Sequence, residues 1–210
     1  MSIDSEYNKY EDTNISIFEK KNRATTKKIV FMDRDGVMIE DVDHIKNEED
    51  VVICEGLNNL LSYLKDRRNI ICVVTNQSSV ARGIIDEDRY EEITEKMLSF
   101  LDNSNQPEYI LTSFYHEAYS QNKENSNWRK PGVGMFEYIK KKIDFDMESA
   151  VMIGDKLSDL RAASDFGIQN LIHIESAIHR TERIKIRDWE KESETNVHYI
   201  NHLDEALMYV

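Results

Sequence analysis

Short apolar segments recur along this chain, and segments whose apolar residues have helical spacing lie between most of them. Short apolar runs predict strands buried on both faces, whereas apolar residues three and four positions apart predict helices with one buried face. The predicted strands lie at residues 29–32, 70–74, 109–111, 150–153, 170–174 and 197–200. The predicted helices lie at residues 56–68, 86–101, 135–143, 160–166 and from 203 onward. This alternation predicts a parallel sheet with helices on both faces.

The 210 residues are enough for one large domain of this kind. We expect an α/β fold, a doubly wound Rossmann-like parallel sheet, over residues 28–210. Residues 1–27 are polar and lack sustained periodicity, so we expect a polar N-terminal extension that is flexible or loosely docked. The predicted strands and helices use most of the chain between the polar clusters described below. This leaves no room for a large cap domain.

The charge balance limits the partners. The net charge is -13, from 40 acidic and 27 basic residues, which argues against a nucleic-acid partner because such partners select a basic face. A small anionic substrate stays possible, because local lysines and a metal ion can reverse the field inside a cleft. The charged segment 176–196 gives no functional signal, and the oligomeric state cannot be inferred.

Cysteine usage and hydropathy predict the compartment. Cys54 and Cys72 are the two cysteines, and both lie in apolar surroundings, so we expect reduced core residues and no disulfide framework. No apolar run approaches the length of a membrane span, and the first residues lack the pattern of a signal peptide. We therefore expect a soluble cytoplasmic protein.

Two acids and a glycine follow the first predicted strand. Asp33 and Asp35 come one residue apart directly after residues 29–32, and Gly36 allows a sharp turn after them. Alternate residues of an extended chain point the same way, so the two carboxylates start on one side of the strand end. Such a pair repels, shares a proton or binds a cation. Taken alone, it is equally compatible with two solvated acids at a strand exit.

Polar clusters also follow two other predicted strands. Thr75 and Asn76 follow residues 70–74, and Gly154, Asp155 and Asp159 follow residues 150–153. Parallel sheets place their sites at the carboxyl ends of their strands, so we expect these clusters to meet. A further cluster, Arg129-Lys130, lies in a loop with Pro131, Gly132 and Gly134.

This set of side chains predicts phosphoryl transfer. Asp33 can attack phosphorus as a nucleophile, and Asp35 can protonate the leaving group and then deprotonate water. Mg²⁺ prefers oxygen ligands, and Asp33, the Asp35 carbonyl and Asp155 would supply them. Lys130 and the Thr75 hydroxyl can stabilise the charge of the transferred phosphoryl group.

Each cluster also has a purely structural interpretation. Thr75 and Asn76 could be caps or turn residues, and Arg129 and Lys130 could be a solvated basic pair. Asp159 is better placed to cap or orient its neighbours than to bind metal. Lys156 could face solvent, and His116 could be structural or exposed.

The motifs together resemble those of haloacid-dehalogenase-type phosphatases, and the resemblance covers about residues 28–175. They are Asp33-Arg-Asp-Gly-Val37, Thr75-Asn-Gln-Ser78, Arg129-Lys-Pro131 and Gly154-Asp-Lys-Leu-Ser-Asp159, in this order. The longer segments Asn76–Gly83 and Arg129–Met135 are similar to the branch that contains heptose 1,7-bisphosphate 7-phosphatases and histidinol-phosphate phosphatases.

The resemblance implies a role for each matching position. Asp33 would be the nucleophile, Asp35 the general acid and base, Thr75 and Lys130 the groups that steady the phosphoryl group, and Asp155 a magnesium ligand. The resemblance and the loop positions together suggest a set of substrate-binding residues: Asp41, Asp43, His44, Asn76, Gln77, Ser78, Arg129 and Lys156.

One segment departs from that branch, which usually carries a zinc-binding loop of Cys-x-His followed by Cys-x-Cys. The corresponding residues here are Phe114-Tyr-His116 and Ser126-Asn-Trp128. A single imidazole cannot make a four-ligand zinc site, so we expect no zinc. The loop must then be held by packing through Phe114, Tyr115 and Trp128, or be mobile.

The expected activity is magnesium-dependent hydrolysis of a small phosphate monoester, with a sugar phosphate such as heptose 1,7-bisphosphate favoured. Histidinol phosphate or another small metabolite is the alternative substrate. The DNA 3′-phosphatase domain of polynucleotide kinase has similar motifs, but the net charge of -13 argues against that substrate. A non-catalytic binding protein on the same fold would be expected to lack a catalytic residue. The chain has all five expected residues: Asp33, Asp35, Thr75, Lys130 and Asp155.

Overall fold

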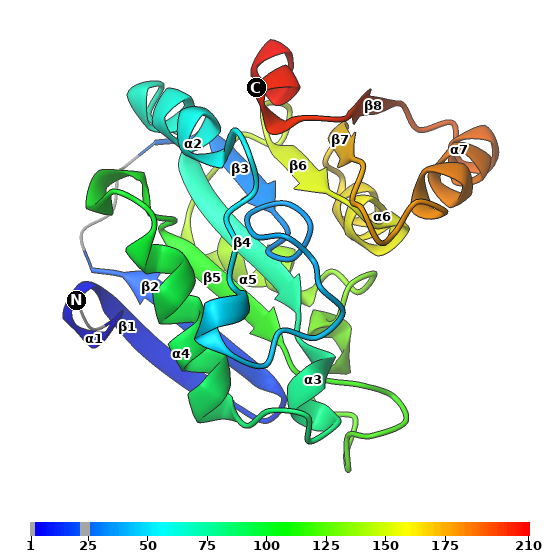
Figure 1. Cartoon of the computed structure of the whole chain (residues 1–210). Helices are drawn as coiled ribbons and strands as arrows, with labels where there is room; N and C mark the ends of the chain where they lie inside the picture. Colours follow the sequence, from blue (N-terminus) through cyan, green and yellow to red (C-terminus); the bar gives the residue numbers. More distant parts are fainter. Residues whose placement is uncertain (1–2, 22–25) are drawn as a thin grey trace.

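The computed structural model describes residues 3–21 and 26–210, which form one eight-stranded sheet with helices on both faces (Figure 1). The strand order is β1-β2-β5-β4-β3-β6-β7-β8. The strands are β1 (Tyr7–Asp12), β2 (Ile15–Lys20), β3 (Ile29–Met32), β4 (Ile70–Asn76), β5 (Tyr109–Ser113), β6 (Val151–Gly154), β7 (Asn170–Ile174) and β8 (Val197–Ile200). Neighbouring strands are parallel throughout the part of the sheet ordered β5-β4-β3-β6-β7-β8. The two pairs that involve β2 are antiparallel.

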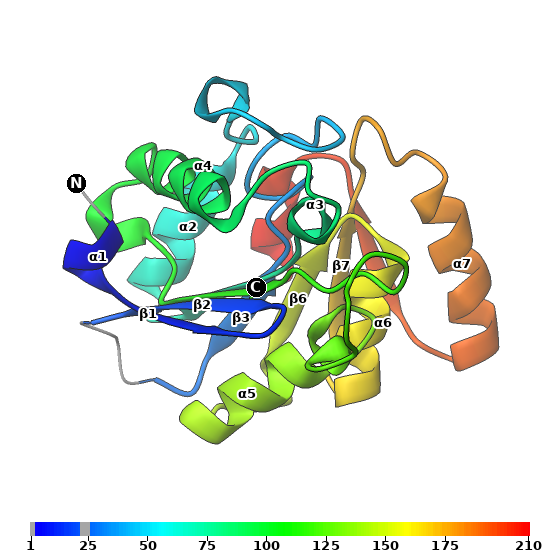
Figure 2. The ribbon, with the colours of Figure 1, turned by 90° about the horizontal axis from the view of Figure 1, so that it is seen from below.

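The helices lie in two layers, seen in Figure 2 above and below the edge of the sheet. On one face are α2 (Leu57–Asp66) and α4 (Glu87–Ser99), and on the other α5 (Gly134–Lys142), α6 (Leu157–Phe166) and α7 (Glu182–Ser193). The shorter helices are α1 (Ile3–Glu6), α3 (Ser78–Ala81) and the 3-10 turns η1 (Glu48–Asp50), η2 (Asn103–Asn105), η3 (Ser126–Trp128) and η4 (Leu203–Met208). The predicted doubly wound α/β fold is confirmed.

The core consists of two apolar layers separated by the sheet. Along β3, Val30 and Met32 pack into the layer under α2 and α4, whereas Ile29 and Phe31 pack into the layer under α5 and α6. All four side chains are at most 1% exposed. Each buried side chain of this size stabilises the fold by roughly 1.5–3 kcal/mol. Because both faces are covered, β3 is continuously apolar and its polar residues follow only where it ends.

The expected absence of a large cap is also confirmed within the described residues. The connection from β3 to α2 is a loop, and Ile39 bridges both Asp35 and Ile53 within it. Val37, Met38 and Ile39 of this loop are fully buried. The loop therefore packs against the core and does not form a separate folded lid.

The N-terminal segment differs from the prediction of a flexible or loosely docked extension. Residues 7–20 form the hairpin β1–β2, and β2 pairs antiparallel with β5 in the register Phe18↔Ile110. All six residues of β2 are buried. Phe18 packs into one core layer and Ile17 into the other, so the hairpin extends the sheet. Residues 1–2 and 22–25 of the predicted extension lie outside the described residues.

Other expectations hold with small differences. Cys54 and Cys72 are free cysteines, the first half-buried and the second buried. The segment after residue 203 is a 3-10 helix, and the charged segment 176–196 contains the unpredicted helix α7. No helix among the described residues combines the length and apolar character that crossing a membrane requires.

Candidate active site

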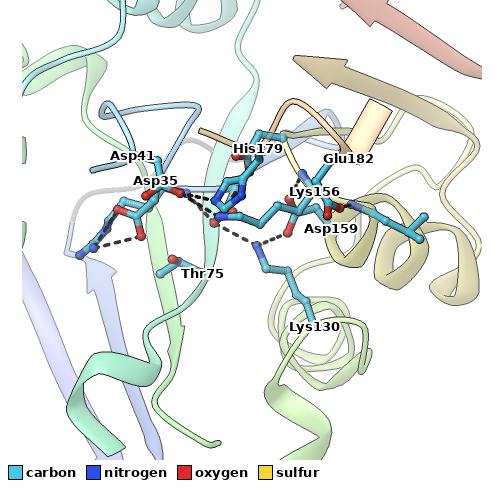
Figure 3. A network of polar contacts seen from close by, with 12 residues as sticks. Asp35, Asp41, Thr75, Lys130, Lys156, Asp159, His179 and Glu182 are labelled. Carbon is cyan, nitrogen blue, oxygen red and sulfur yellow. Dashed lines mark hydrogen bonds and ion pairs between the residues drawn. The ribbon is translucent and has the colours of Figure 1, made fainter. Parts of the chain in front are cut away.

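The carboxyl ends of β3, β4 and β6 meet at one edge of the sheet, which brings the predicted polar clusters together. Asp33 follows β3, Thr75 is the penultimate residue of β4, and Asp155 follows β6. Since the three strands are parallel neighbours, their ends point to the same side. Lys130 reaches the same point from the loop before α5. Figure 3 shows Lys130 and Lys156 pointing toward the surrounding carboxylates.

Lys130 is the buried centre of this cluster. Its Nζ lies 3.0 Å from Asp33 Oδ1 and 2.7 Å from Asp159 Oδ1, and it donates to the Val74 carbonyl at 2.6 Å. Burial acts to lower the pKa of Lys130, but Asp159 and Asp33 outweigh it and raise the pKa. The ammonium is therefore charged at neutral pH, as a group that stabilises a phosphoryl group must be.

Asn76 fixes the backbone of Lys130. Its side-chain amide donates to the Lys130 carbonyl at 2.9 Å, and its Oδ1 accepts from the Lys130 N–H at 3.0 Å. This pair of bonds ties the end of β4 to the loop before α5. The predicted substrate-binding residue Asn76 thus makes contacts that position a neighbour.

Asp35 lies in different surroundings from Asp33. Arg34 Nη2 donates to Asp35 Oδ1 at 2.9 Å, and Gln77 Nε2 donates to Asp35 Oδ2 at 2.5 Å and to Thr75 Oγ1 at 2.9 Å. Arg34 also donates to Gln77 Oε1 at 2.8 Å. The four side chains form one network that fixes the direction of the Asp35 carboxylate and of the buried Thr75 hydroxyl.

Arg34 was not predicted as a site residue. It is 3% exposed and its guanidinium lies 5.5 Å from the ring centroid of Tyr90. An arginine directly between two acids after an apolar strand was a usable signal, because a buried guanidinium needs carboxylate partners. Its partner Gln77 was predicted to bind substrate, and in the structure Gln77 donates a hydrogen bond to Asp35.

Three carboxylates offer a cation site. Oxygens of Asp33, Asp155 and Asp159 lie within 4.8 Å of one another, and all three residues are buried. Both carboxylate oxygens of Asp155 lack a hydrogen-bond partner among the described residues. Burial raises the pKa of Asp155 well above its usual value, against the opposing effect of Lys156. A buried carboxylate that accepts no hydrogen bond from the described residues, lies 3.8 Å from the Lys156 ammonium and has two other carboxylates beside it fits Mg²⁺, which takes oxygen ligands.

Gly36 allows this arrangement. Its φ is +84°, and a Cβ on it would lie 2.4 Å from Asp155 Oδ2. A side chain would therefore occupy the space against the Asp155 carboxylate. The carboxylate of Asp35 is not part of the acidic cluster and faces Arg34 and Gln77 instead.

A cavity of about 280 Å³ opens beside Lys130, and all eight predicted substrate-binding residues line it: Asp41, Asp43, His44, Asn76, Gln77, Ser78, Arg129 and Lys156. Arg34, Asp35, Lys130 and His179 also line the cavity. Thr75 is fully buried behind Gln77.

Asp41 holds two cationic or polar groups at the cavity wall. Its Oδ2 lies 3.0 Å from Lys156 Nζ and 2.9 Å from His179 Nε2. Burial acts to raise the pKa of Asp41, but Lys156 outweighs it and lowers the pKa. His179 comes from the charged segment that gave no functional signal, so the sequence did not indicate it.

The loop of residues 114–128, expected to be either packed or mobile, is packed at both ends. Phe114 is 3% exposed and its ring lies 5.1 Å from that of Tyr90, and Trp128 lies 5.5 Å from Tyr138. His116 sits at the surface against Arg82. The loop returns to the site at Arg129, whose Nη1 donates to the Tyr115 carbonyl at 3.1 Å.

Known proteins resemble this chain in sequence over the same segment. Residues 28–190 match the sequence profile of a family described as polynucleotide kinase 3 phosphatase. D-glycero-beta-D-manno-heptose-1,7-bisphosphate 7-phosphatase of Haemophilus ducreyi is 31% identical over 191 residues, which cover 88% of this chain and 98% of that one. The Vibrio cholerae enzyme of the same name is 34% identical over 75% of this chain and 86% of its own.

The chain belongs to the haloacid dehalogenase superfamily of phosphatases. Within this superfamily it lies in the branch of the heptose bisphosphate phosphatases, as the motifs predicted. The structure of D,D-heptose 1,7-bisphosphate phosphatase from B. bronchiseptica, complexed with magnesium and phosphate, has the same fold. It superposes with a TM-score of 0.72 at 22% identity and covers 87% of this chain and 99% of that one.

Proposed function

We propose that this phosphatase removes the 7-phosphate of a heptose 1,7-bisphosphate in a magnesium-dependent reaction. The observation that carries the proposal is the Lys130 ammonium between Asp33 and Asp159, beside the buried carboxylate of Asp155, which accepts no hydrogen bond among the described residues. A nucleophile, a fixed cation and a metal-binding acid are what transfer of a phosphoryl group to a carboxylate requires. The names of the relatives support the choice of sugar bisphosphate.

Asp33 and Asp35 divide the chemistry. In the first step, an oxygen of the Asp33 carboxylate forms a bond to phosphorus, the bond to the sugar oxygen breaks, and Asp35 gives that oxygen a proton. In the second step, Asp35 takes a proton from water, the water oxygen bonds to phosphorus, and the aspartyl-phosphate bond breaks. Inorganic phosphate leaves and both acids return to their starting states.

Asp33, Asp155 and the Asp35 carbonyl would hold Mg²⁺, with Asp159 directed to Lys130. When bound, the ion supplies positive charge that offsets the repulsion between these carboxylates and the phosphate. Lys130 supplies the second fixed positive charge. The Thr75 hydroxyl, oriented by Gln77, can donate to a phosphoryl oxygen as charge develops on it.

The rest of the cavity suits a small polar substrate with a second anionic group. Arg129 and Lys156 line the cavity together with the polar residues Asp43, His44 and Ser78. We assign Arg129 and Lys156 to recognition of the part of the substrate that does not react. A volume of about 280 Å³ lies near the lower end for ligand pockets, which favours a small metabolite over a polymer.

One observation favours a second candidate, the 3′-phosphate of a nucleic acid, because the matching family is described as a polynucleotide kinase 3 phosphatase. The net charge of -13 opposes it, since nucleic-acid binding depends on cationic contacts with phosphates. Histidinol phosphate remains the alternative among small metabolites. We also expect that the chain binds no structural zinc.

Phosphate release from a substrate panel tests the proposal. The panel contains heptose 1,7-bisphosphates, sugar monophosphates, histidinol phosphate and a 3′-phosphorylated oligonucleotide, each with Mg²⁺ and with EDTA. We expect turnover only with Mg²⁺ and the highest kcat/KM for a heptose bisphosphate. A higher value for the oligonucleotide would favour the second candidate. If Asp33→Asn equals the parent on every substrate, the enzymatic proposal is wrong.

A further inference from the structure

The turn of the N-terminal hairpin binds the loop of residues 114–128. The turn residues Thr13 and Asn14 lie between β1 and β2, and the Asn14 carbonyl accepts from the Phe114 N–H at 2.8 Å. The Asn14 side-chain amide donates to the Glu124 carbonyl at 3.0 Å and to Asn122 Oδ1 at 3.3 Å. The turn therefore contacts both the outgoing and the returning arm of the loop.

A reciprocal bond comes from the loop itself. Asn125 Nδ2 donates to the Thr13 carbonyl at 2.9 Å. Asn14 and Asn125 both have left-handed backbones, with φ of 63° and 54°, which asparagine tolerates better than most residues. The two asparagines thus combine the backbone conformation of the two turns with the bonds between them.

The loop of residues 114–128 leads directly to Arg129, which lines the cavity. Phe114, held by Asn14, immediately precedes Tyr115, whose carbonyl accepts from Arg129 Nη1 at 3.1 Å. On the returning arm, Asn125 immediately precedes η3, and Arg129 follows η3. Both the backbone and the guanidinium of Arg129 are thus set by segments that the hairpin turn holds.

Lys130 follows Arg129 directly in the sequence, but different residues hold it in place. Asn76 holds both its backbone N–H and its carbonyl, and Val74, Asp33 and Asp159 surround its Nζ. These partners lie on the central strands or on α6, and none belongs to the hairpin or to the loop. A loosened loop would therefore displace Arg129 and leave Lys130 in place.

We propose that the β1–β2 hairpin is a positioning element that fixes Arg129 for substrate recognition through the loop of residues 114–128. The inference rests on the proposed function, because it takes Arg129 as the group that recognises the non-reacting part of the substrate. Asn14 and Asn125 act through the loop and are positioning residues.

The test uses Asn14→Gly and Asn125→Gly in the full chain. Glycine keeps the left-handed backbone and removes only the side-chain bonds. Glu194→Gly is the matched control, because Glu194 has a φ of 56° at the end of α7, away from the hairpin and the loop. Asn14→Asp is a second variant that keeps the size of the side chain and loses its donor. The readouts are amide hydrogen exchange of residues 115–128 and separate values of KM and kcat.

We expect exchange of the loop to become at least fivefold faster in Asn14→Gly, Asn125→Gly and Asn14→Asp, and to be unchanged in Glu194→Gly. KM for the sugar bisphosphate should rise three- to tenfold, with kcat within a factor of two of the parent, because the lost contact acts on binding and Lys130 stays in place. In an Arg129→Gln background, Asn14→Gly should raise KM no further.

Three results would overturn the inference: unchanged loop exchange, a fall in kcat with constant KM, or an equal rise in KM in the Arg129→Gln background. If the parent hydrolyses no substrate of the panel, the proposed function is wrong. Hydrogen exchange of the loop then tests whether the hairpin fixes the loop. The affinity of Asn14→Gly and of Arg129→Gln for inorganic phosphate tests whether the position of Arg129 depends on the hairpin. Equal affinity in Asn14→Gly and the parent, with weaker binding by Arg129→Gln, would contradict that dependence.

Discussion

Asp33 and Asp35, one residue apart in the sequence, are fixed by different partners. Asp33 faces the Lys130 ammonium at 3.0 Å, whereas Asp35 faces Arg34 and Gln77. A carboxylate next to a buried ammonium is ready to attack phosphorus, and a carboxylate held in a network of donors has a fixed direction for proton transfer. This difference in surroundings supports the division of roles that we propose for Asp33 and Asp35.

Replacement of Asp35 tests this separation. Asp35→Asn should lower kcat by about 10²–10⁴-fold, the usual contribution of a general acid and base, while Asp33 can still become phosphorylated. The measurement is phosphate release together with mass spectrometry of acid-quenched enzyme. Asp165→Asn, an exposed acid on α6, is the control. Asp33→Asn should show no phosphorylated enzyme, and a phosphorylated species in that variant would contradict the assignment.

Asp155 links metal binding to stability. Burial raises its pKa well above the usual value, so without a cation the ionised carboxylate destabilises the folded state, and this cost is felt as the pH rises above the ordinary pKa of an aspartate. In EDTA at pH 7, Asp155→Asn should be more stable than the parent by about 1–3 kcal/mol.

Urea unfolding with EDTA and with Mg²⁺ measures this effect. Mg²⁺ should stabilise the parent and leave Asp155→Asn nearly unchanged, because a ligand that binds only the folded state raises its stability. Equal responses of the two proteins to Mg²⁺ would show that Asp155 does not bind the ion.

At the scale of single residues, the sequence indicated the acids but missed two of their partners, Arg34 and His179. Asp33, Lys130 and Asp155 were found because each lies beside a predicted strand end or a glycine-containing turn. His179 was missed because its contact with Asp41 joins residues 138 positions apart and no local pattern marks it. Arg34 stood inside a motif and was given no role of its own.

The element that the sequence misjudged is the β1–β2 hairpin. The patch Ile15-Ser-Ile-Phe18 is too short to show a period, and its stability depends on β5, more than 90 residues away. In the sheet, its residues are buried on both faces against the two core layers. Local sequence could not indicate that β2 pairs with β5. In α2 and α4, by contrast, the spacing of the apolar residues indicates which face is buried.

Phe18 provides a stability test of the hairpin. It is fully buried, so Phe18→Ala should lower the free energy of unfolding by about 3–5 kcal/mol, the usual cost for a core phenylalanine. Tyr10→Ala on the neighbouring strand is the control, because Tyr10 is 47% exposed and should change stability by less than about 1 kcal/mol. Chemical unfolding measures both. A hairpin that docks only loosely would show a small effect for Phe18→Ala.

Over the whole molecule, stability should depend on pH through His173 in β7. Its side chain is 1% exposed, and burial together with Arg183 lowers its pKa to about 4. In the unfolded chain the imidazole takes up a proton below a pKa of about 6.5, while the folded protein does not. Stability from this group is therefore complete above pH 6.5 and falls as the pH drops toward 4.

Urea unfolding at pH 7.5 and pH 5 measures the effect. The parent should lose about 2 kcal/mol more than His173→Gln between these two values, at about 1.4 kcal/mol for each pH unit. His202→Gln is the control: His202 is exposed, so this variant should lose as much stability between the two pH values as the parent. Equal losses in parent and His173→Gln would show that His173 does not carry this dependence.

Most strands and helices from residue 28 onward, α7 excepted, followed from the sequence, because short apolar runs indicate buried strands and helical spacing of apolar residues indicates helices. The parallel direction of the strands followed from the rule that parallel strands need helical crossovers. The β1–β2 edge of the sheet did not follow, since these two strands connect by a hairpin and obey no such rule. The helix α7 carries a weak apolar stripe, with Ile186 as its one fully buried residue, so its period was hidden among charges.

The sheet is wider than the segment that matches the family. The match covers residues 28–190, whereas β2 ends at Lys20 and β8 begins at Val197, so both flanks of the sheet lie outside it. A protein trimmed to the matching residues would expose the backbone donors and acceptors of β5 on one side and of β7 on the other. Unpaired strand edges recruit further strands from other molecules. Trimming to the family boundaries should therefore favour aggregation, because the edge strands would no longer be β1 and β8 but β5 and β7, whose residues are almost all buried in the intact sheet.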